Sequence, residues 1–302
     1  MNFWKNKKVL VTGGNGFIGR HLTAALKVHG AEVKIPENYI VDQPTAASAV
    51  TGAEIIFHLA AHVGGIHYNQ VHPGTLMYRN LLPTINLFEA ARQAKIDRML
   101  LVSSACVYSR FCTIPTPETE GFKDDPEPTN FGYGWSKRAA ELLARTYSKE
   151  YGMKIGIVRP YNVYGPGDNF NPEQSHVIPG LIKRVIDGER PLTVWGDGTA
   201  TRSFIYVKDV LIGMMLALEK YPQPDPINLG TAEEISIKRL AQLIIKLSGK
   251  KTPLRFDRSK PNGQPRRRCD TAKAKKILGF TAKTKLVDGL KPTIDFYRYG
   301  KE

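Results

Sequence analysis

The sequence lacks long apolar runs and has few cysteines. None of its apolar stretches approaches the length of about 18 residues that marks a membrane-spanning helix. An apolar run at 9–11 follows the first residue so closely that we expect no signal peptide. The three cysteines, Cys106, Cys112 and Cys269, have no disulfide or zinc spacing. We therefore expect a cytoplasmic protein with neither a membrane anchor nor a metal site.

Internal repeats and low-complexity linkers are also missing from the sequence. The chain has 302 residues, of which 42% are hydrophobic and 24% charged, as in ordinary globular proteins. This length allows a large buried core in one large domain or two.

Acidic residues are scarce relative to basic ones, and the formal net charge is +15. Residues 250–302 hold sixteen Lys and Arg but only five Asp and Glu. Such an excess suits either a nucleic-acid surface or a pocket for a nucleotide diphosphate surrounded by solvated lysines. No aromatic stacking platform is interleaved with the basic residues. We therefore favour the nucleotide ligand over a nucleic acid.

A glycine-rich turn follows the first predicted strand, at 7–12, and precedes a helical pattern at 17–29. A dinucleotide site requires this context, because glycines let the backbone approach a pyrophosphate at the helix N-terminus. We predict that the dinucleotide is bound by Gly13, Gly16, Phe17, Ile18 and Gly19.

Two later segments extend the predicted dinucleotide site. Glu37 follows a second predicted strand, at 32–35, and is spaced from the glycines like the carboxylates that bind an adenosine ribose. The alternative for Glu37 is a surface carboxylate in a loop. A third strand, at 54–61, ends in Ala60 and Ala61, whose small side chains would let a cofactor lie against the backbone.

Strands and helices alternate through the first half of the chain, which predicts an α/β fold with a doubly wound parallel sheet of the Rossmann type. We expect a dinucleotide-binding domain at 1–165, joined by part of 200–230, and mainly a substrate lobe at 166–302. Further strands are predicted at 98–103, 154–159, 192–195, 203–207 and 227–229. Helices are predicted at 73–94, with a disturbance at Pro83, and at 133–151, 177–187, 235–248, 271–278 and 286–299.

Tyr133 and Lys137 lie four residues apart, so in a helix they share one face. A tyrosine keeps its proton up to about pH 10, but a nearby ammonium stabilises the phenolate and lowers that pKa. The pair could then exchange a proton with a substrate hydroxyl near neutral pH. Ser104 follows the strand at 98–103 and should reach the same edge of the sheet.

Ser104, Tyr133 and Lys137, together with the glycine motif, resemble the short-chain dehydrogenase/reductase superfamily over essentially the whole chain. Arg-Pro at 159–160 and Tyr-Gly-Pro at 164–166 resemble its extended, nucleotide-sugar branch. The resemblance implies a bound nicotinamide nucleotide, with Tyr133 as acid or base on a sugar oxygen. It implies that Lys137 lowers the pKa of Tyr133 and holds the nicotinamide ribose, while Ser104 bonds the same sugar oxygen. It also implies a homodimer through the helices at 73–94 and 133–151.

Three further stretches, at 60–66, 165–179 and 259–267, resemble the GDP-L-fucose synthase family. This resemblance implies 3,5-epimerisation and 4-reduction of a GDP-4-keto-6-deoxy-hexose, with Cys106 and His176 as the epimerising acid/base pair. Thiols and imidazoles have pKa values near enough to neutrality to move the protons that a 4-keto group acidifies. If the strand continues, Cys106 lies two residues beyond Ser104 and faces the same side. The resemblance places on the nucleotide Asn162, Arg184, Trp195, Arg202 and one or both of Arg266 and Arg267.

Two features leave alternatives open. Fucose synthases favour NADPH and lack an acidic residue at the end of the second strand, whereas Glu37 suggests NAD. The stretch at 104–108 also resembles GDP-mannose 3,5-epimerases, which use NAD without net reduction. The alternative function is therefore an NAD-dependent nucleotide-sugar epimerase, at C3 and C5 or at C4. A 4,6-dehydratase is disfavoured, because that family carries Asp-Glu where Ala105 and Cys106 stand. A non-enzymatic RNA-binding protein is disfavoured by the intact set of Ser104, Tyr133 and Lys137.

Overall fold

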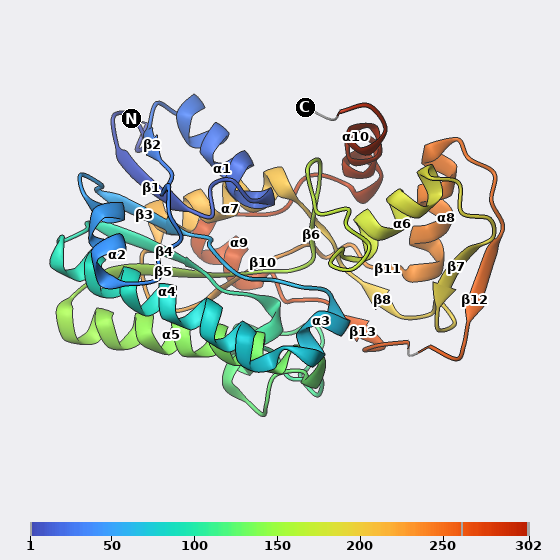
Figure 1. The fold of residues 1–302 in the computed structure, drawn as a ribbon, viewed down its shortest axis with the longest axis horizontal. Coiled ribbons are helices and arrows are strands. Elements are labelled where there is room, and N and C mark those ends of the chain that lie inside the picture. The colour runs from blue at the N-terminus through green and yellow to red at the C-terminus, as the bar shows by residue number, and fades with distance from the viewer. Residues whose placement is uncertain (1, 261, 301–302) are drawn as a thin grey trace.

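The larger part of the protein is built around a six-stranded parallel sheet of order β10-β5-β4-β3-β1-β2 (Figure 1). The computed structural model describes residues 2–260 and 262–300. The strands are β1 (Lys8–Thr12), β2 (Glu32–Lys34), β3 (Ile55–His58), β4 (Arg98–Val102), β5 (Lys154–Pro160) and β10 (Ile227–Leu229). This arrangement confirms the predicted α/β fold with a doubly wound sheet.

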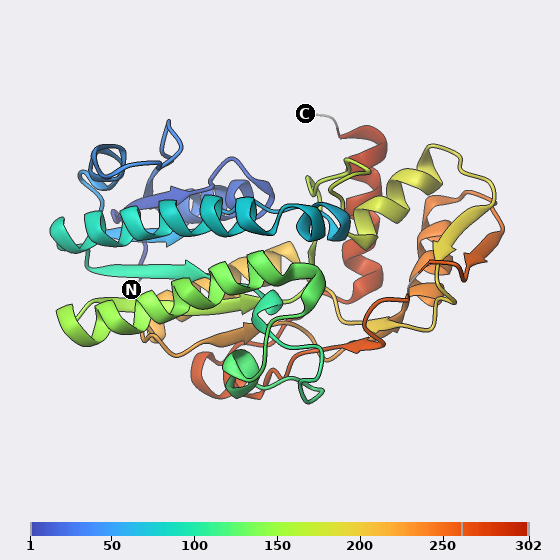
Figure 2. The same cartoon turned by 60° about the horizontal axis from the view of Figure 1, so that its bottom comes forward.

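Apolar residues of the central strands alternate between two buried faces, as the period of a strand requires. One face carries Phe57 and Leu100 and is covered by α1 (Phe17–Val28), α7 (Val207–Lys220) and α9 (Ala272–Leu278). The other face carries Ile56 and Leu101 and is covered by α2 (Gln43–Val50), α4 (Pro73–Gln93) and α5 (Phe131–Tyr151). Helices α4 and α5 lie side by side (Figure 2). The sheet is therefore buried on both sides.

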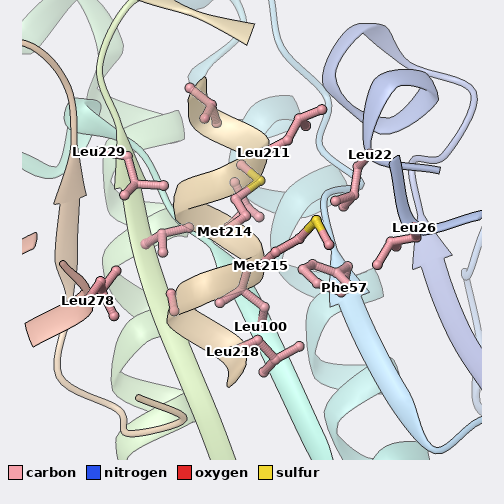
Figure 3. Packing of buried hydrophobic residues seen from close by; sticks show 14 of the residues in the cluster. Leu22, Leu26, Phe57, Leu100, Leu211, Met214, Met215, Leu218, Leu229 and Leu278 are labelled. Atoms are coloured by element: carbon pink, nitrogen blue, oxygen red, sulfur yellow. The ribbon is translucent and has the colours of Figure 1, made fainter. Parts of the chain in front are cut away.

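Helix α7 lies within the first of these cores (Figure 3). Met214 and Met215 pack among Phe57, Leu100 and residues of α1. The strand β10, which follows α7, pairs with β5 at the edge of the large sheet. The chain thus returns from its second half to complete this sheet.

A smaller lobe is built on a third core by α6 (Val177–Ile186), α8 (Ile237–Ser248) and α10 (Leu286–Tyr299). Its strand pairs are β6 (Val163–Tyr164) with β9 (Ile205–Tyr206) and β7 (Leu192–Trp195) with β12 (Leu254–Asp257). A three-stranded sheet contains β11 (Ile235–Ser236), β8 (Thr201–Arg202) and β13 (Arg266–Arg267). The remaining helices are α3 (Ile66–Val71) and the 3-10 helices η1 (Ala105–Val107), η2 (Glu118–Phe122) and η3 (Pro128–Asn130).

Pro83 does not disturb α4, which runs through it from Pro73 to Gln93. A proline removes one N–H of the helix ladder and leaves the carbonyl four residues earlier without its partner. That carbonyl belongs to Arg79, and it accepts a hydrogen bond from the Tyr39 hydroxyl. The predicted disturbance at Pro83 is therefore wrong, because a side chain from another segment replaces the missing donor.

No helix in the described ranges 2–260 and 262–300 has the length and apolar character needed to cross a membrane.

Candidate active site

The glycine turn joins the carboxyl end of β1 to the first turn of α1. Gly13 has φ +71°, and a Cβ placed on it would lie 2.8 Å from the backbone nitrogen of Ala60. A Cβ on Gly19 would lie 2.0 Å from the carbonyl oxygen of Gly13, so only glycine fits there. Among the described residues no side chain caps α1, and its first turn contains no acidic residue. The turn therefore fits a pyrophosphate at the helix N-terminus, next to Phe17 and Ile18.

A buried chain of hydrogen bonds fixes the backbone beside this turn. Thr84 donates to the carbonyl of Asn80, so it accepts from Nε2 of His58 at 2.9 Å. Nδ1 of His58 then accepts from the Thr12 hydroxyl at 2.8 Å, and the Thr12 oxygen accepts from the Ala60 N–H. Burial lowers the pKa of His58 to about 3, and the charge of Lys137 adds to this effect. The neutral imidazole thus ties the ends of β1 and β3 to α4.

Glu37 is exposed in the bend that follows β2. Two residues earlier, Ile35 packs so closely on Gly14 that a Cβ on that glycine would lie 2.6 Å from its side chain. Glu37 therefore lies two residues after a side chain that contacts the glycine turn, and its role at the ribose stays a prediction. Ala61, three residues after the end of β3, is exposed as well.

Ser104, Tyr133 and Lys137 come together at the carboxyl end of β4. Lys137 and Tyr133 are buried on one face of α5, with the Lys137 ammonium 5.7 Å from the centre of the Tyr133 ring. The ammonium donates a 2.9 Å hydrogen bond to the carbonyl of Val102, the last residue of β4. Ser104 is close enough to Tyr133 for its hydroxyl to lower the pKa of the phenol.

The pKa values of this group differ from those expected from the sequence. Burial raises the pKa of Tyr133, Cys106 adds to the rise, and Ser104 opposes it. Burial lowers the pKa of Lys137 to about 8, against the opposing effects of Glu141 and Cys106. The expected lowering of the Tyr133 pKa by Lys137 is therefore wrong for this conformation, because desolvation of the phenolate dominates. Tyr133 is protonated at neutral pH.

Cys106 lies beside Ser104, but not along an extended strand. The strand β4 ends at Val102, and the Ser104 hydroxyl caps η1 by accepting a 3.1 Å bond from the Cys106 N–H. The predicted two-residue strand repeat is wrong, because the serine side chain closes a 3-10 turn instead. A Cβ on Gly134 would lie 2.5 Å from the Cys106 carbonyl oxygen, so α5 packs directly on this turn.

His176 is the residue directly before α6 and is exposed to solvent. The protein atoms around it lower its pKa, and the positive charge of Arg267 adds to this effect. The same Arg267 points its Nη2 at the Cys106 sulfur, at 3.8 Å. Arg267 thus contacts Cys106 directly and acts on His176 through its charge, although 70 residues separate Cys106 and His176 in the chain.

The two neighbouring arginines of β13 face opposite sides. In the parallel pairing of β13 with β8, Arg266 stands beside Thr201 and Arg267 beside Arg202. Arg266 and Thr201 both bind the carboxylate of Glu234, with Arg266 at 2.8 Å. Burial and the neighbouring Arg267 lower the pKa of Arg202 to about 10. Of the two predicted ligands, only Arg267 thus faces the site, together with Arg202.

The other predicted nucleotide ligands have different surroundings in the structure, and two of them are bound to protein groups. Arg184 makes two 2.5 Å bonds to the Glu189 carboxylate and a further bond to the carbonyl of Thr193. Asn162, at φ +40°, donates a 2.8 Å bond to the Ser203 carbonyl. Trp195 ends β7 with 61% of its surface exposed.

Residues 9–230 match the NAD dependent epimerase/dehydratase family. The chain belongs to this family. GDP-L-fucose synthase 1 of Arabidopsis thaliana is 31% identical over 303 residues, covering 97% of this chain and 94% of that protein. The dTDP-4-dehydro-6-deoxy-D-allose reductase of a Streptomyces species is 32% identical, covering 99% and 98%. The GDP-L-fucose synthetase of Naegleria fowleri bound to NADP matches with a TM-score of 0.88 and 25% identity, covering 97% and 93%.

Membership of the NAD dependent epimerase/dehydratase family makes the protein an enzyme of the short-chain dehydrogenase/reductase type, as the sequence predicted. An NAD(P) cofactor is typical of this family, and the glycine turn at the start of α1 suits one. The relatives include enzymes named for GDP-linked and for dTDP-linked sugars.

Sequence reasoning missed three groups of this family member's site. Thr12 and His58 were passed over, although a histidine inside an apolar strand is itself a signal that its ring needs buried partners. Glu141, four residues after Lys137, was missed as well, although that spacing places it on the same helix face.

Proposed function

We propose that this enzyme epimerises C3 and C5 of a GDP-linked 4-keto-6-deoxy-hexose and then reduces C4. The observation that carries the proposal is the position of Cys106, whose thiol is contacted by Arg267 and whose N–H is bound by Ser104, together with the charge of the same Arg267 acting on His176. A plain ketoreductase needs only the set of Ser104, Tyr133 and Lys137. The full-length similarity to GDP-L-fucose synthases supports the same substrate class.

In the reduction, Tyr133 is the proton donor. Its raised pKa keeps the phenol protonated at neutral pH, so it can deliver a proton to the C4 oxygen while Ser104 holds that oxygen. The bound nicotinamide nucleotide supplies the hydride to C4. Lys137, Gly13, Gly16, Gly19 and the Ala60–Ala61 backbone would hold that nucleotide.

In the epimerisation, Cys106 and His176 act from different chain segments. One group removes the proton that the 4-keto group has acidified, and the other returns a proton to the opposite face of the sugar ring. Because its pKa is lowered, His176 is neutral at pH 7 and free to accept a proton.

Substrate binding would rest on Arg202 and Arg267, whose adjacent guanidinium groups suit a diphosphate. Trp195 offers an exposed ring for the base, and Asn162 lies at the junction of β5 and β6. Arg184 could contact the nucleotide only if its bonds to Glu189 were broken. We therefore propose that Arg184 instead holds β7, the strand that ends in Trp195, through its bond to the Thr193 carbonyl.

The cofactor choice follows from Glu37. An exposed carboxylate in the bend after the second strand would accept bonds from a ribose and would repel a 2′-phosphate. We therefore propose NADH as the preferred reductant, although a similar structure was solved with NADP. The same residue supports the second candidate function, a nucleotide-sugar epimerase that uses NAD without net reduction.

A homodimer through α4 and α5 is part of the proposal. These helices pack on one another and expose Tyr78, Ile85, Leu142 and Tyr151. Exposed apolar side chains along a helix pair suit a second copy. Light scattering of the purified protein would give twice the monomer mass of 33.7 kDa if the proposal holds.

The function is tested by incubating the enzyme with GDP-4-keto-6-deoxy-mannose in heavy water, with NADH and NADPH in separate reactions. We expect loss of reduced-cofactor absorbance together with deuterium at C3 and C5 of the product. Cofactor oxidation without deuterium would leave a simple 4-ketoreductase, and deuterium exchange without oxidation would leave an epimerase. The dTDP-linked analogue serves as the control for the base.

A further inference from the structure

A fully buried ion pair lies behind the Ser104, Tyr133 and Lys137 group. Arg159 of β5 bonds Glu141 of α5 twice, at 2.6 and 2.8 Å, and both side chains are completely buried. Taking two charges out of water costs so much that an apolar pair of similar volume is often as stable. Fold stability alone therefore gives little reason for this pair.

The carboxylate of Glu141 also reaches the end of β4. It accepts a 2.5 Å hydrogen bond from the hydroxyl of Ser103, whose backbone N–H is bonded to Val158 of β5. Ser103 immediately precedes Ser104 in the chain. The ion pair thus connects α5 and β5 to the residue directly before Ser104, which caps η1.

Arg159 is enclosed on its remaining sides. Its Nη1 donates to the Tyr108 hydroxyl at 2.9 Å and to the Glu118 carbonyl at 2.8 Å. A Cβ on Gly121 would come within 2.3 Å of its guanidinium. The guanidinium therefore has one fixed position, and it fixes the Glu141 carboxylate in turn.

Glu141 lies one helical turn after Lys137 on the same face of α5. The titratable groups that face the Lys137 ammonium are Tyr133 and Glu141 from α5, Cys106 from η1 and His58 from β3. His58 and Tyr133 are neutral at pH 7, because burial lowers the pKa of the first to about 3 and raises that of the second. Glu141 is thus the carboxylate that opposes the effect of burial on Lys137.

We propose that Glu141 is a positioning residue for the active site: anchored by Arg159, it holds Ser103 in place and keeps the Lys137 side chain charged. The proposal rests on the function proposed for Lys137 above. Removal of the carboxylate should deprotonate Lys137 at a lower pH, since an attractive charge raises the pKa of an ammonium.

The test compares Glu141→Gln with the double variant Glu141→Gln/Arg159→Met, which leaves no buried unpaired charge. The paired control is Lys7→Met/Glu54→Gln, which removes a half-exposed ion pair at the other end of β1 and β3.

Carbon-13 NMR of labelled lysine, assigned through Lys137→Arg, follows Lys137 in each protein without any substrate. We expect its titration to move to lower pH by about one unit or more in Glu141→Gln, and by less in the double variant. The control should leave it unmoved.

The pH–rate profile is the second readout. The alkaline limb of the pH–rate profile should move to lower pH, as the Lys137 titration does. The shift should again be larger in Glu141→Gln than in the double variant. An unmoved titration in the folded double variant and in Glu141→Gln would overturn the proposal and leave the pair a structural element. If the wild type shows no turnover while the titration moves as expected, the proposed function fails and the charge-holding role of Glu141 stands.

Discussion

Arg266 and Arg267 are neighbours in the chain, yet the alternation of β13 gives them different partners. Arg266 is held by Glu234, whereas Arg267 lies near Cys106, His176 and Arg202. The sequence alone does not show which of these arginines faces the site, because this depends on how β13 pairs with β8.

This difference makes the two arginines a matched pair for mutation. Arg267→Met should raise KM for the nucleotide sugar roughly ten- to a hundredfold, since a bond to a charged phosphate is lost. Arg266→Met should leave KM close to the wild-type value. Steady-state kinetics with the GDP-linked substrate would measure both, and equal effects of the two substitutions would contradict the assignment.

Tyr133 is the proposed proton donor of the reduction. Tyr133→Phe keeps the ring but removes the transferable proton, so turnover should fall roughly a hundredfold or more. Nucleotide binding, followed by fluorescence, should persist. A variant with wild-type turnover would remove Tyr133 from its proposed role.

We propose that one side chain, Glu37, determines the choice between NADH and NADPH. Glu37→Ala removes the charge that repels a 2′-phosphate, so kcat/KM for NADPH relative to NADH should rise severalfold. A wild-type enzyme that already strongly prefers NADPH would show that Glu37 lies away from the ribose. Arg20 and Lys34 would then be the residues to substitute next.

At the scale of elements, the sequence predicted the long periodic segments well. The helix at 286–299 has the expected bounds, and the strands around the glycine turn lie within a few residues of theirs. Helix α7 was missed because it is apolar on most sides, buried between the sheet and α1 and α9, and so lacks a clear amphipathic period. Strand β12 and helices α2 and α3 were missed because each is short.

The turn at η1 could not be predicted from strand periodicity. The residues Ser-Ala-Cys-Val continue an apolar pattern, but the hydroxyl of Ser104 binds the Cys106 N–H and ends the extended conformation. The predicted neighbours Ser104 and Cys106 are still close together, through a turn instead of a strand repeat. Their proximity was foreseeable from the sequence, and its geometry was not.

The packing of α5 on η1 can be tested with two glycines. Gly134→Ala would place a methyl 2.5 Å from the Cys106 carbonyl oxygen, so α5 and η1 must separate. We expect a loss of about 1–3 kcal/mol in the free energy of unfolding and lower turnover in both proposed steps. Gly74→Ala on α4 meets no described atom within 4 Å and should be neutral or stabilising by up to about 1 kcal/mol. Thermal unfolding and turnover of the two variants provide the comparison.

At the scale of the whole molecule, the proposed epimerising groups come from distant parts of the chain. Cys106 follows β4 of the large sheet, His176 precedes α6 of the smaller lobe, and Arg267 comes from β13 (Figure 1). The sequence could name these residues only through family resemblance, since no local pattern links them. The fold brings them to one place because the chain crosses from the large sheet to the smaller lobe after β5 and returns through α7.

The most direct test of the account is proton exchange at C3 and C5 in heavy water, measured by proton NMR and mass spectrometry of the product. Cys106→Ser replaces the thiol with a hydroxyl of similar size that cannot move protons near neutral pH. We predict that it abolishes deuterium incorporation at C3 and C5, while 4-reduction of the unepimerised sugar survives, and that His176→Asn impairs exchange at one or both carbons. Unchanged exchange in both variants would contradict the epimerase/reductase function and leave a 4-ketoreductase or a 4-epimerase.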